Sequence, residues 1–340
     1  MKFNENAKDY FVFVEQRNHL IEEVSLELIG EASKLAKQVN YNVVGVLLGH
    51  EVQDLTADLI AYGCDKVIVI DDKVLETFIP ETYTKAISAV INEYIPDAFF
   101  IGATTVGRDV GPRIAARVRT GLTADATIIE IDPENEDSKL LWITRPAFGG
   151  NLFGTIVCPD HHPQMATVRP GVLLKNQYDK NRKGEVINFE VEFAKEDIKL
   201  RILKEVERKI DGLDIASADI IVAGGRGVGS KENFVLLEEI AHKLGGVVAG
   251  SRAAVDAGWI TKDKQVGQTG KTVRPKVYIA CGISGSVQHV AGMDNAELII
   301  AINKDQYAPI FEEGHVNIVG DLFEILPEVA SKIEHQINSK

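Results

Sequence analysis

The stretch VYIACGISGSVQHVAGMDNAELIIAIN, residues 277–303, decides the fold of the second half of the chain. Its apolar start, 277–281, predicts a strand that leads directly into a glycine- and serine-rich turn, 282–286, and then into a short helix. Such a turn is the physical form of a phosphate cradle, because glycine permits close backbone approach and the N–H groups that begin a helix attract anionic oxygens. From spacing alone, a chain reversal with helix caps is the alternative.

A second apolar run, residues 298–302, predicts the next parallel strand and ends in Asn303, Lys304 and Asp305. Ligands of open α/β sheets bind outside the carboxyl ends of the strands, so these polar groups are expected at a binding edge. The other elements predicted in this half are a strand at 220–223, a helix at 231–244, a strand at 246–249 and a closing amphipathic helix at 323–337, interrupted near Pro327. Together they form a doubly wound unit.

The turn GGRGVGS, residues 224–230, nearly matches the dinucleotide fingerprint GxGxxG from Gly225. Ser230 stands where the last glycine should be. A nicotinamide-dependent oxidoreductase that uses this turn is therefore an alternative of a different class.

The first half alternates short apolar strands with helices, which implies parallel pairing and right-handed crossovers. The predicted strands are 10–15, 43–48, 67–70 and 98–101, and the predicted helices are 20–39, 55–62, 80–95 and 110–118. After Thr127 the strands 128–131, 140–144, 152–157 and 165–169 follow without helices, so they are expected to pair largely antiparallel. The predicted fold is α/β: an N-terminal domain with a parallel sheet plus an antiparallel extension, then the doubly wound domain.

The segment 176–209 is dense in charge and is interpreted as a solvated connector and hinge zone. It places the domain boundary near Val206, with an N-terminal domain at 1–205 and a second domain, including the C-terminal helix, at 206–340.

The composition excludes several classes of protein. Lys and Arg number 37 against 50 Asp and Glu, a net charge of −13, which argues against nucleic acid or an anionic membrane as the main partner. No apolar run is long enough to cross a bilayer, and the N-terminus has no apolar signal core. Cys64, Cys158 and Cys281 are scattered and His161-His162 has no supporting ligand, so neither a disulfide framework nor a metal site is expected, and the cytoplasm fits best.

Three blocks in order carry a specific resemblance: SRAAVDAGW (251–259), QVGQTGK (265–271) and the opening stretch. They resemble the flavin-binding segments of the electron transfer flavoprotein alpha subunit. The resemblance extends upstream through GRDVGPRIAARVRTGLTADAT (107–127) and RPAFGGN (145–151), so it covers most of the chain. It implies a second domain that binds FAD and carries single electrons, with no catalytic side chain.

The same resemblance implies which residues contact FAD. They are Arg226, Ser251, Arg252, Gln265, Val266, Gly267, Gln268, Thr269, Ser284, Gly285, Ser286, Val287, Gln288, His289, Asn303, Asp321 and Leu322.

Among these residues, Arg226 is expected near the phosphates and Arg252 against the isoalloxazine ring. Thr269 is expected to donate toward N5, and His289 toward the C2 carbonyl. A cation or a strong donor there would stabilise the negative charge that reduction places on the ring. Taken singly, Arg252 could instead pair with Asp256, and His289 could be a satisfied core histidine.

The resemblance also implies partners: a heterodimer with the family's beta subunit and electron exchange with an acyl-CoA dehydrogenase. Residues Arg108, Asp109, Arg113, Arg145 and Asn151 of the first domain are interpreted as facing the beta subunit, although capping and surface ion pairs would explain them as well.

Two types of complex are distinguished. In the conventional, non-bifurcating type the beta subunit holds AMP and the alpha FAD is the sole flavin. In the bifurcating type the beta subunit holds a second FAD that takes a hydride from NADH, and the electrons divide between the alpha FAD and an acceptor such as ferredoxin. The opening FVFVEQRN resembles anaerobic bacterial members and favours bifurcation. A non-redox, nucleotide-binding regulator built on the first domain is a third class.

Overall fold

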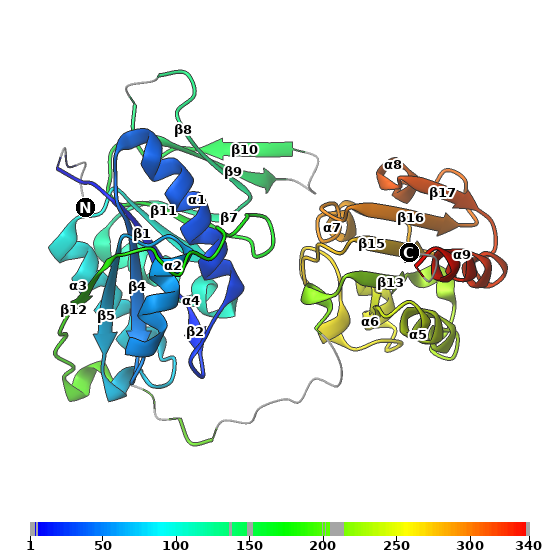
Figure 1. Ribbon diagram of the computed structural model, residues 1–340, viewed down its shortest axis with the longest axis horizontal. Coiled ribbons are helices and arrows are strands. Elements are labelled where there is room, and N and C mark those ends of the chain that lie inside the picture. Colours follow the sequence, from blue (N-terminus) through cyan, green and yellow to red (C-terminus); the bar gives the residue numbers. More distant parts are fainter. Residues whose placement is uncertain are drawn as a thin grey trace. The chain divides into compact units, whose positions relative to one another are not determined.

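The computed structural model describes residues 4, 6–135, 138–147, 152–198, 200, 202–204 and 214–337 (Figure 1). The chain forms two compact units, one of residues 1–148 and 152–205 and the other of 149–151 and 206–340. The predicted boundary near Val206 falls within 205–213, outside the described residues, and stays a prediction.

The first unit is built on a seven-stranded parallel sheet, as the strand–helix alternation predicts. Its strand order is β12-β5-β4-β1-β6-β11-β7. The strands are β1 (Tyr10–Val14), β4 (Val43–Gly49), β5 (Lys66–Asp71), β6 (Ala98–Gly102), β7 (Leu122–Ala126), β11 (Gln164–Val168) and β12 (Glu185–Asn188). The helices are α1 (Glu23–Val39), α2 (Thr56–Tyr62), α3 (Pro80–Tyr94) and α4 (Thr105–Val118).

Strand β1, YFVFV, shows why the sheet needs helices on both faces. All five of its residues are buried. Tyr10, Val12 and Val14 join the core under α1 and α2, whereas Phe11 and Phe13 join the core under α3 and α4. Strands buried on both faces are continuous in apolar residues, which is typical of parallel sheets.

The antiparallel extension is smaller than predicted. Strands β8 (Ile128–Ile131), β9 (Leu141–Ala147) and β10 (Leu152–Ile156) form a sheet in the order β10-β9-β8. The prediction that 165–169 pairs antiparallel is wrong, because β11 lies parallel between β6 and β7. All five residues of β11 are buried, which only the interior of the large sheet provides. Strand β7, LTADA, was not predicted because its sequence is barely apolar.

The predicted helix 20–39 begins later than expected, at Glu23. Leu20–Ile21 (β3) instead pairs with Gln16–Arg17 (β2) in a small antiparallel ribbon.

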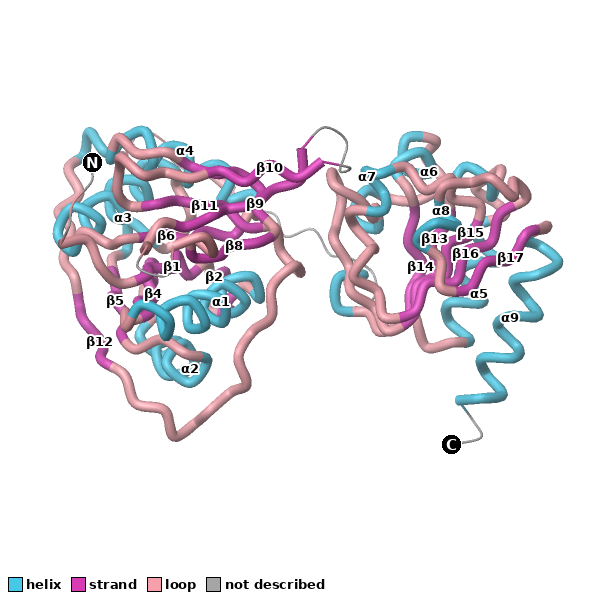
Figure 2. The backbone as a smooth tube through the Cα atoms, turned by 90° about the horizontal axis from the view of Figure 1, so that it is seen from above, coloured by secondary structure: helices cyan, strands magenta, loops and turns pink. Residues whose placement is uncertain are grey.

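The segment 176–197 is not a free connector, which corrects the hinge interpretation for this part of the chain. Asn176 donates from Nδ2 to the carbonyl of Tyr62 at 2.9 Å, and β12 pairs with β5. Lys85 Nζ meets the Asp197 carboxylate at 2.6 Å. Figure 2 shows the segment running past α1 and α2 to the sheet edge. It is therefore part of the first unit, and we call it the strap.

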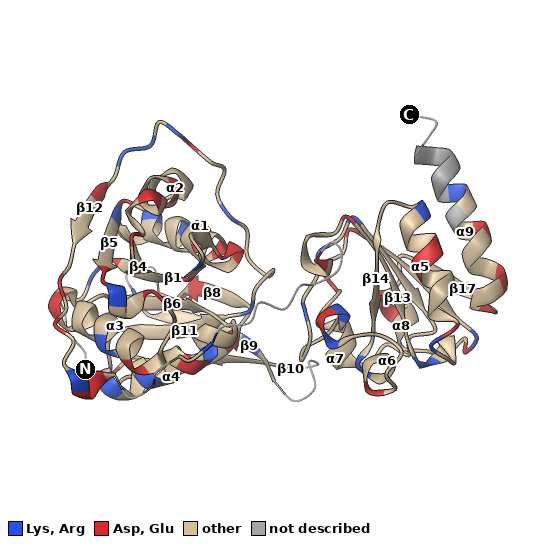
Figure 3. Ribbon diagram, turned by 90° about the horizontal axis from the view of Figure 1, so that it is seen from below, with Lys and Arg blue, Asp and Glu red and all other residues tan. Residues whose placement is uncertain are grey.

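The second unit is a five-stranded parallel sheet in the order β14-β13-β15-β16-β17, which confirms the doubly wound prediction. The strands are β13 (Ile220–Gly224), β14 (Val247–Gly250), β15 (Val277–Cys281), β16 (Leu298–Asn303) and β17 (Val316–Val319). The helices are α5 (Phe234–Lys243), α6 (Arg252–Asp256), α7 (Val287–Val290), α8 (Ile310–Glu313) and α9 (Leu322–Ile337). Helix α9 runs through Pro327 without the predicted interruption. In both units, charged residues lie mainly on helices and loops rather than on central strands (Figure 3).

Glu27 on α1 holds the loop that follows β11 by a contact that is sensitive to pH. Its side chain is buried, and both carboxylate oxygens accept the backbone N–H of Gly171, at 2.9 and 3.1 Å. Burial raises the pKa of Glu27 to about 7, although the hydrogen bond from Gly171 opposes this. Because the folded pKa exceeds that of the unfolded chain, Glu27 stabilises the fold below about pH 4.5, and this contribution is lost as the pH rises through about 7.

We therefore expect the first unit to lose about 3 kcal/mol more stability between pH 4.5 and pH 8 than its Glu27→Gln variant does. Urea unfolding followed by Trp142 fluorescence in a Trp259→Phe background measures the difference, since the chain has only these two tryptophans. Glu93→Gln, an exposed position on α3, is the matched control and should behave like the parent. The same pH dependence in Glu27→Gln and parent would contradict the assignment.

Candidate functional site

A pocket of about 820 Å³ lies in the second unit, where strands end at their carboxyl edge. After β13 the chain continues to β14 on one side of the sheet, whereas after β15 it continues to β16 on the other side. The crevice between the ends of β13 and β15 is therefore the topological switch point, where α/β sheets bind ligands. Its volume is that of an ordinary small-molecule or cofactor site.

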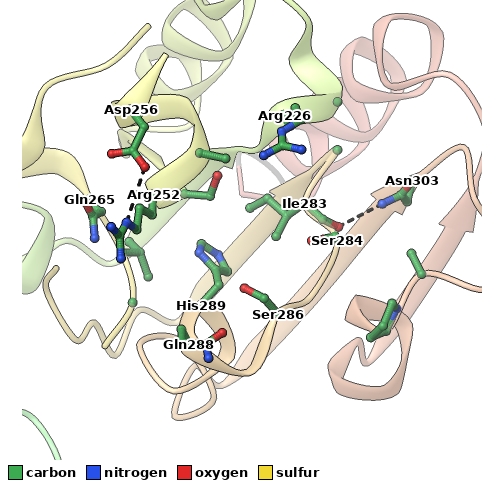
Figure 4. Close-up of a pocket in the computed structure, with 18 of the residues that line it drawn as sticks. Arg226, Arg252, Asp256, Gln265, Ile283, Ser284, Ser286, Gln288, His289 and Asn303 are labelled. Atoms are coloured by element: carbon green, nitrogen blue, oxygen red, sulfur yellow. Dashed lines mark hydrogen bonds and ion pairs between the residues drawn. The ribbon is translucent and has the colours of Figure 1, made fainter. Parts of the chain in front are cut away.

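Most of the residues predicted to contact FAD line this pocket. They are Arg226, Ser251, Arg252, Gln265, Val266, Gly267, Gln268, Thr269, Ser284, Ser286, Gln288, His289 and Asn303. Ten residues of the lining are labelled in Figure 4. The predicted FAD-contact set omits Gly227, Ala253, Asp256, Gly282, Ile283, Asp305, Ala308 and Pro309. Of these, Gly282 and Ile283 belong to the predicted turn 282–286, and Asp305 is one of the polar groups expected at the binding edge. Most of the omitted residues lie inside the sequence blocks quoted above, so a prediction that included every residue of each block would have found them.

Four predicted residues do not line the pocket: Gly285, Val287, Asp321 and Leu322. Leu322 is buried in the core, and Asp321 pairs with Lys304 at 3.0 Å. Gly285 has φ of +87°, and a Cβ there would lie 2.1 Å from the backbone nitrogen of Ile310. Gly285, Asp321 and Leu322 therefore have structural partners of their own.

The glycine turn 224–230 crosses the loop that follows β15 and is hydrogen-bonded to it, so it is not an open phosphate cradle. The N–H groups of Gly225 and Gly227 donate to the carbonyls of Cys281 and Gly282, both at 2.9 Å. A Cβ on Gly227 would lie 2.8 Å from Cα of Gly282, so only glycine fits. The next helix, α5, begins at Phe234 rather than at the predicted 231. The amides of Gly225 and Gly227 are therefore already occupied, which argues against a nicotinamide dinucleotide bound by this turn.

Two buried polar atoms of the pocket have no hydrogen-bond partner within the described part of the chain: Ser251 Oγ and His289 Nδ1. Buried polar groups are normally satisfied, so both atoms indicate a ligand that this chain does not itself supply. Thr269 Oγ1 accepts from Gln265 Nε2 at 3.0 Å, which leaves its own O–H available to donate. The pocket therefore offers hydrogen-bond donors to a ligand rich in acceptors, which is the chemistry of a flavin dinucleotide.

The electrostatics separate His289 from Arg252. His289 is 4% exposed, and burial lowers its pKa to about 4 although the backbone of Val266 opposes this. At neutral pH it is therefore an uncharged imidazole that can donate a hydrogen bond but carries no positive charge. Arg252 is the cation of the pair, and its side chain, 70% exposed, pairs with Asp256 at 3.4 Å. The ion pair between Arg252 and Asp256, which the sequence offers as the alternative to a ligand role for Arg252, is thus present. The Arg252 side chain nevertheless lines the pocket.

Comparison with known proteins matches residues 10–194 to the electron transfer flavoprotein domain and residues 214–294 to the electron transfer flavoprotein FAD-binding domain. The chain belongs to the electron transfer flavoprotein alpha-subunit family. It is 51% identical to an electron transfer flavoprotein subunit alpha of Thermoanaerobacterium thermosaccharolyticum, over 96% of this chain and 98% of that one. This electron transfer flavoprotein alpha chain binds FAD, and the donors of the pocket fit that cofactor.

Two other relatives have names that specify a reaction. One is the acryloyl-CoA reductase electron transfer subunit beta of Anaerotignum propionicum, 44% identical over 98% of this chain and 97% of that one. The other is the lactate dehydrogenase (NAD(+),ferredoxin) subunit LctC of Acetobacterium woodii, 42% identical over 97% of this chain and 78% of that one. Alpha subunits of the family pair with a beta subunit.

The charged cluster predicted in the first unit is partly satisfied within the chain. Arg113 pairs with Asp109 at 2.9 Å, and Arg108 with Asp125 at 3.6 Å. The Nε of Arg145 is buried and has no hydrogen-bond partner among the described residues. Asn151 lies outside the described residues.

A second pocket, of about 570 Å³, lies at the ends of β1 and β4 in the first unit. The Glu15 carboxylate sits at the N-terminus of α4, where it accepts hydrogen bonds from Thr104 Oγ1 and Arg17 Nη2. The place where a phosphate would bind thus already holds an anion. This argues against the non-redox, nucleotide-binding regulator considered from the sequence, since its nucleotide phosphate would have to bind here.

No group of three or more potential metal-ligating side chains occurs among the described residues. Within the same residues, no helix combines the length and apolar character needed to cross a membrane.

Gly267→Ala is expected to weaken FAD binding at least ~10-fold, about 1.4 kcal/mol. Gly267 has φ of +135°, and a Cβ there would lie 2.7 Å from the carbonyl oxygen of Gln288, so the loop must shift. FAD titration of the deflavinated protein measures the effect. Gly245→Ala is the matched control, because Gly245 also has positive φ, +68°, but nothing lies within 4 Å of its Cβ position. Unchanged FAD affinity in Gly267→Ala would contradict the assignment.

Proposed function

We propose that this chain is the FAD-binding half of a heterodimer that passes single electrons between a flavin of the beta subunit and an acyl-CoA dehydrogenase, within an NADH-dependent bifurcating complex that also serves ferredoxin. The observation that carries the bifurcating type is the similarity, over 97% of this chain, to a relative whose name contains both NAD(+) and ferredoxin. The relative named for acryloyl-CoA reductase supports an acyl-CoA enzyme as partner.

The bound FAD supplies the one-electron chemistry, and the side chains of the pocket bind it and set its potential. We assign Arg226 and Ser251 to the phosphates, and Asn303 to the adenosine end. Thr269 and His289 donate hydrogen bonds to the ring. None of these roles makes or breaks a substrate bond.

The face toward the beta subunit is assigned to the first unit, near Arg108, Arg113 and Arg145. The buried Nε of Arg145 supports this, since a partner can supply its acceptor. Leu152 and Phe153 on β10 are 60% and 64% exposed and would be available to a partner on either face of this strand. The cysteines are free thiols, with Cys64 and Cys281 buried, as in a reducing cytoplasm.

The conventional carrier is the second candidate, because the most similar of these three relatives is named simply as an electron transfer flavoprotein subunit. The two types differ in how many flavins a heterodimer holds.

We expect the purified heterodimer to release two FAD per alpha–beta pair, and NADH to bleach the flavin absorbance under anaerobic conditions. Gly267→Ala is the internal control, since its weaker FAD binding should lower the flavin content of this chain's site alone. One FAD and one AMP per heterodimer, with no reduction by NADH, would establish the conventional type instead.

Arg252→Ala is expected to lower the reduction potential of the alpha FAD, because the cation favours the reduced, more negative ring. A tenfold loss in the preference for reduced FAD corresponds to about 60 mV for one electron. Spectroelectrochemistry measures it. Arg252→Lys should retain most of the effect, and Lys262→Ala, an exposed cation outside the pocket lining, should change nothing. An unaltered potential in Arg252→Ala with FAD bound would remove Arg252 from this role.

A further inference from the structure

The imidazole of His289 is hydrogen-bonded to a buried tyrosine. The hydroxyl of Tyr278, on β15, lies 2.9 Å from His289 Nε2, on α7. Tyr278 is fully buried and His289 is 4% exposed. The other ring nitrogen, Nδ1, makes no hydrogen bond within the described part of the chain, and His289 projects into the pocket (Figure 4).

The chemistry of the two groups selects one tautomer. A neutral imidazole carries one N–H, and the partner of one nitrogen decides where that proton lies. If Nε2 carried it, the Tyr278 oxygen would accept it, and the phenolic hydrogen would have no acceptor among the described residues. A buried donor without a partner is costly. If the phenol donates to Nε2, the hydroxyl is satisfied and Nδ1 carries the hydrogen.

The environment keeps both groups in the required protonation states. Burial raises the pKa of Tyr278 well above its usual value, so the phenol keeps its hydrogen at neutral pH. Burial lowers the pKa of His289 to about 4, so the imidazole is neutral.

We propose that Tyr278 is a positioning residue that fixes His289 as the Nδ1–H tautomer, so that Nδ1 donates a hydrogen bond to an acceptor atom of bound FAD. The inference rests on the assignment of this pocket to FAD. Tyr278 itself does not line the pocket and acts through His289 alone. It therefore determines whether the buried nitrogen facing the cofactor is a donor or an acceptor.

The tautomer can be read directly by NMR of the heterodimer labelled with ¹⁵N-histidine, because proton–nitrogen couplings distinguish the two ring nitrogens. The chain has eight histidines, and His289→Gln identifies the signal of interest. We expect a single Nδ1–H tautomer in the parent without FAD, and a shift of the Nδ1 signal when FAD is added. In Tyr278→Phe we expect a mixture that includes the Nε2–H tautomer.

The functional consequence is measured as the potential of the alpha FAD. Tyr278→Phe should lower the preference for reduced over oxidised FAD about tenfold, a decrease of about 60 mV for one electron. Tyr83→Phe is the matched control, since it also removes a buried phenol that hydrogen-bonds, to the carbonyl of Leu75, but lies in the other unit. It should leave the potential unchanged.

A double-mutant cycle separates positioning from general loosening of the core. Asparagine at position 289 places an amide N–H near the location of Nδ1 and has no tautomer to fix. Tyr278→Phe should therefore have little further effect on the potential in the His289→Asn background. Equal effects of Tyr278→Phe in both backgrounds would show a merely structural role and overturn the proposal.

Two other outcomes overturn it as well. One is an Nε2–H tautomer in the parent. The other is an Nδ1–H signal that FAD does not change, because the hydrogen bond would then go to the backbone near Val266 instead. Failure of the FAD-site assignment is distinguishable, since the tautomer is measured without cofactor and FAD binding is measured separately on the parent.

Discussion

The second unit depends on the hydrogen-bonded crossing of the loops that follow β13 and β15. Backbone N–H groups of one loop pair with backbone carbonyls of the other, at a separation that excludes any side chain at Gly227. This crossing closes the switch point of the sheet. It brings Arg226 from one loop and Ser284 from the other into one pocket, although they are far apart in the sequence. Gly225 and Gly227 serve this contact and not a phosphate.

The sequence predicts the pocket better than it predicts the first unit. Short blocks with glycine at turns and polar residues at strand ends specify local geometry, and most of the predicted residues line the pocket. The positions of β11 and of the strap depend on pairing between segments that are distant in the sequence. Strand β11 pairs with β6, and β12 of the strap pairs with β5. A local sequence pattern does not predict such pairings. In the strap, a high charge density conceals apolar side chains such as Phe189 that pack on the core.

Charge at the pocket also depends on burial that residue type alone does not reveal. A histidine in a binding motif suggests a cation, yet burial leaves His289 neutral, and the positive charge belongs to the exposed Arg252. In the sequence, Tyr278 cannot be distinguished from any other residue of a buried strand. Its significance follows only from the 2.9 Å contact across eleven residues of chain.

The position of β11 has a consequence for synthesis on the ribosome. Strands β6 and β7 are neighbours in sequence order, but β11 lies between them and pairs with both. The sheet therefore cannot be completed while only the first 163 residues have emerged, and its far edge waits for β12 at 185–188. Until then the nascent chain exposes the apolar flank of β6, a surface prone to mispairing. Chaperone binding during translation is thus most needed over this interval, before any of the cofactor-binding unit has been made.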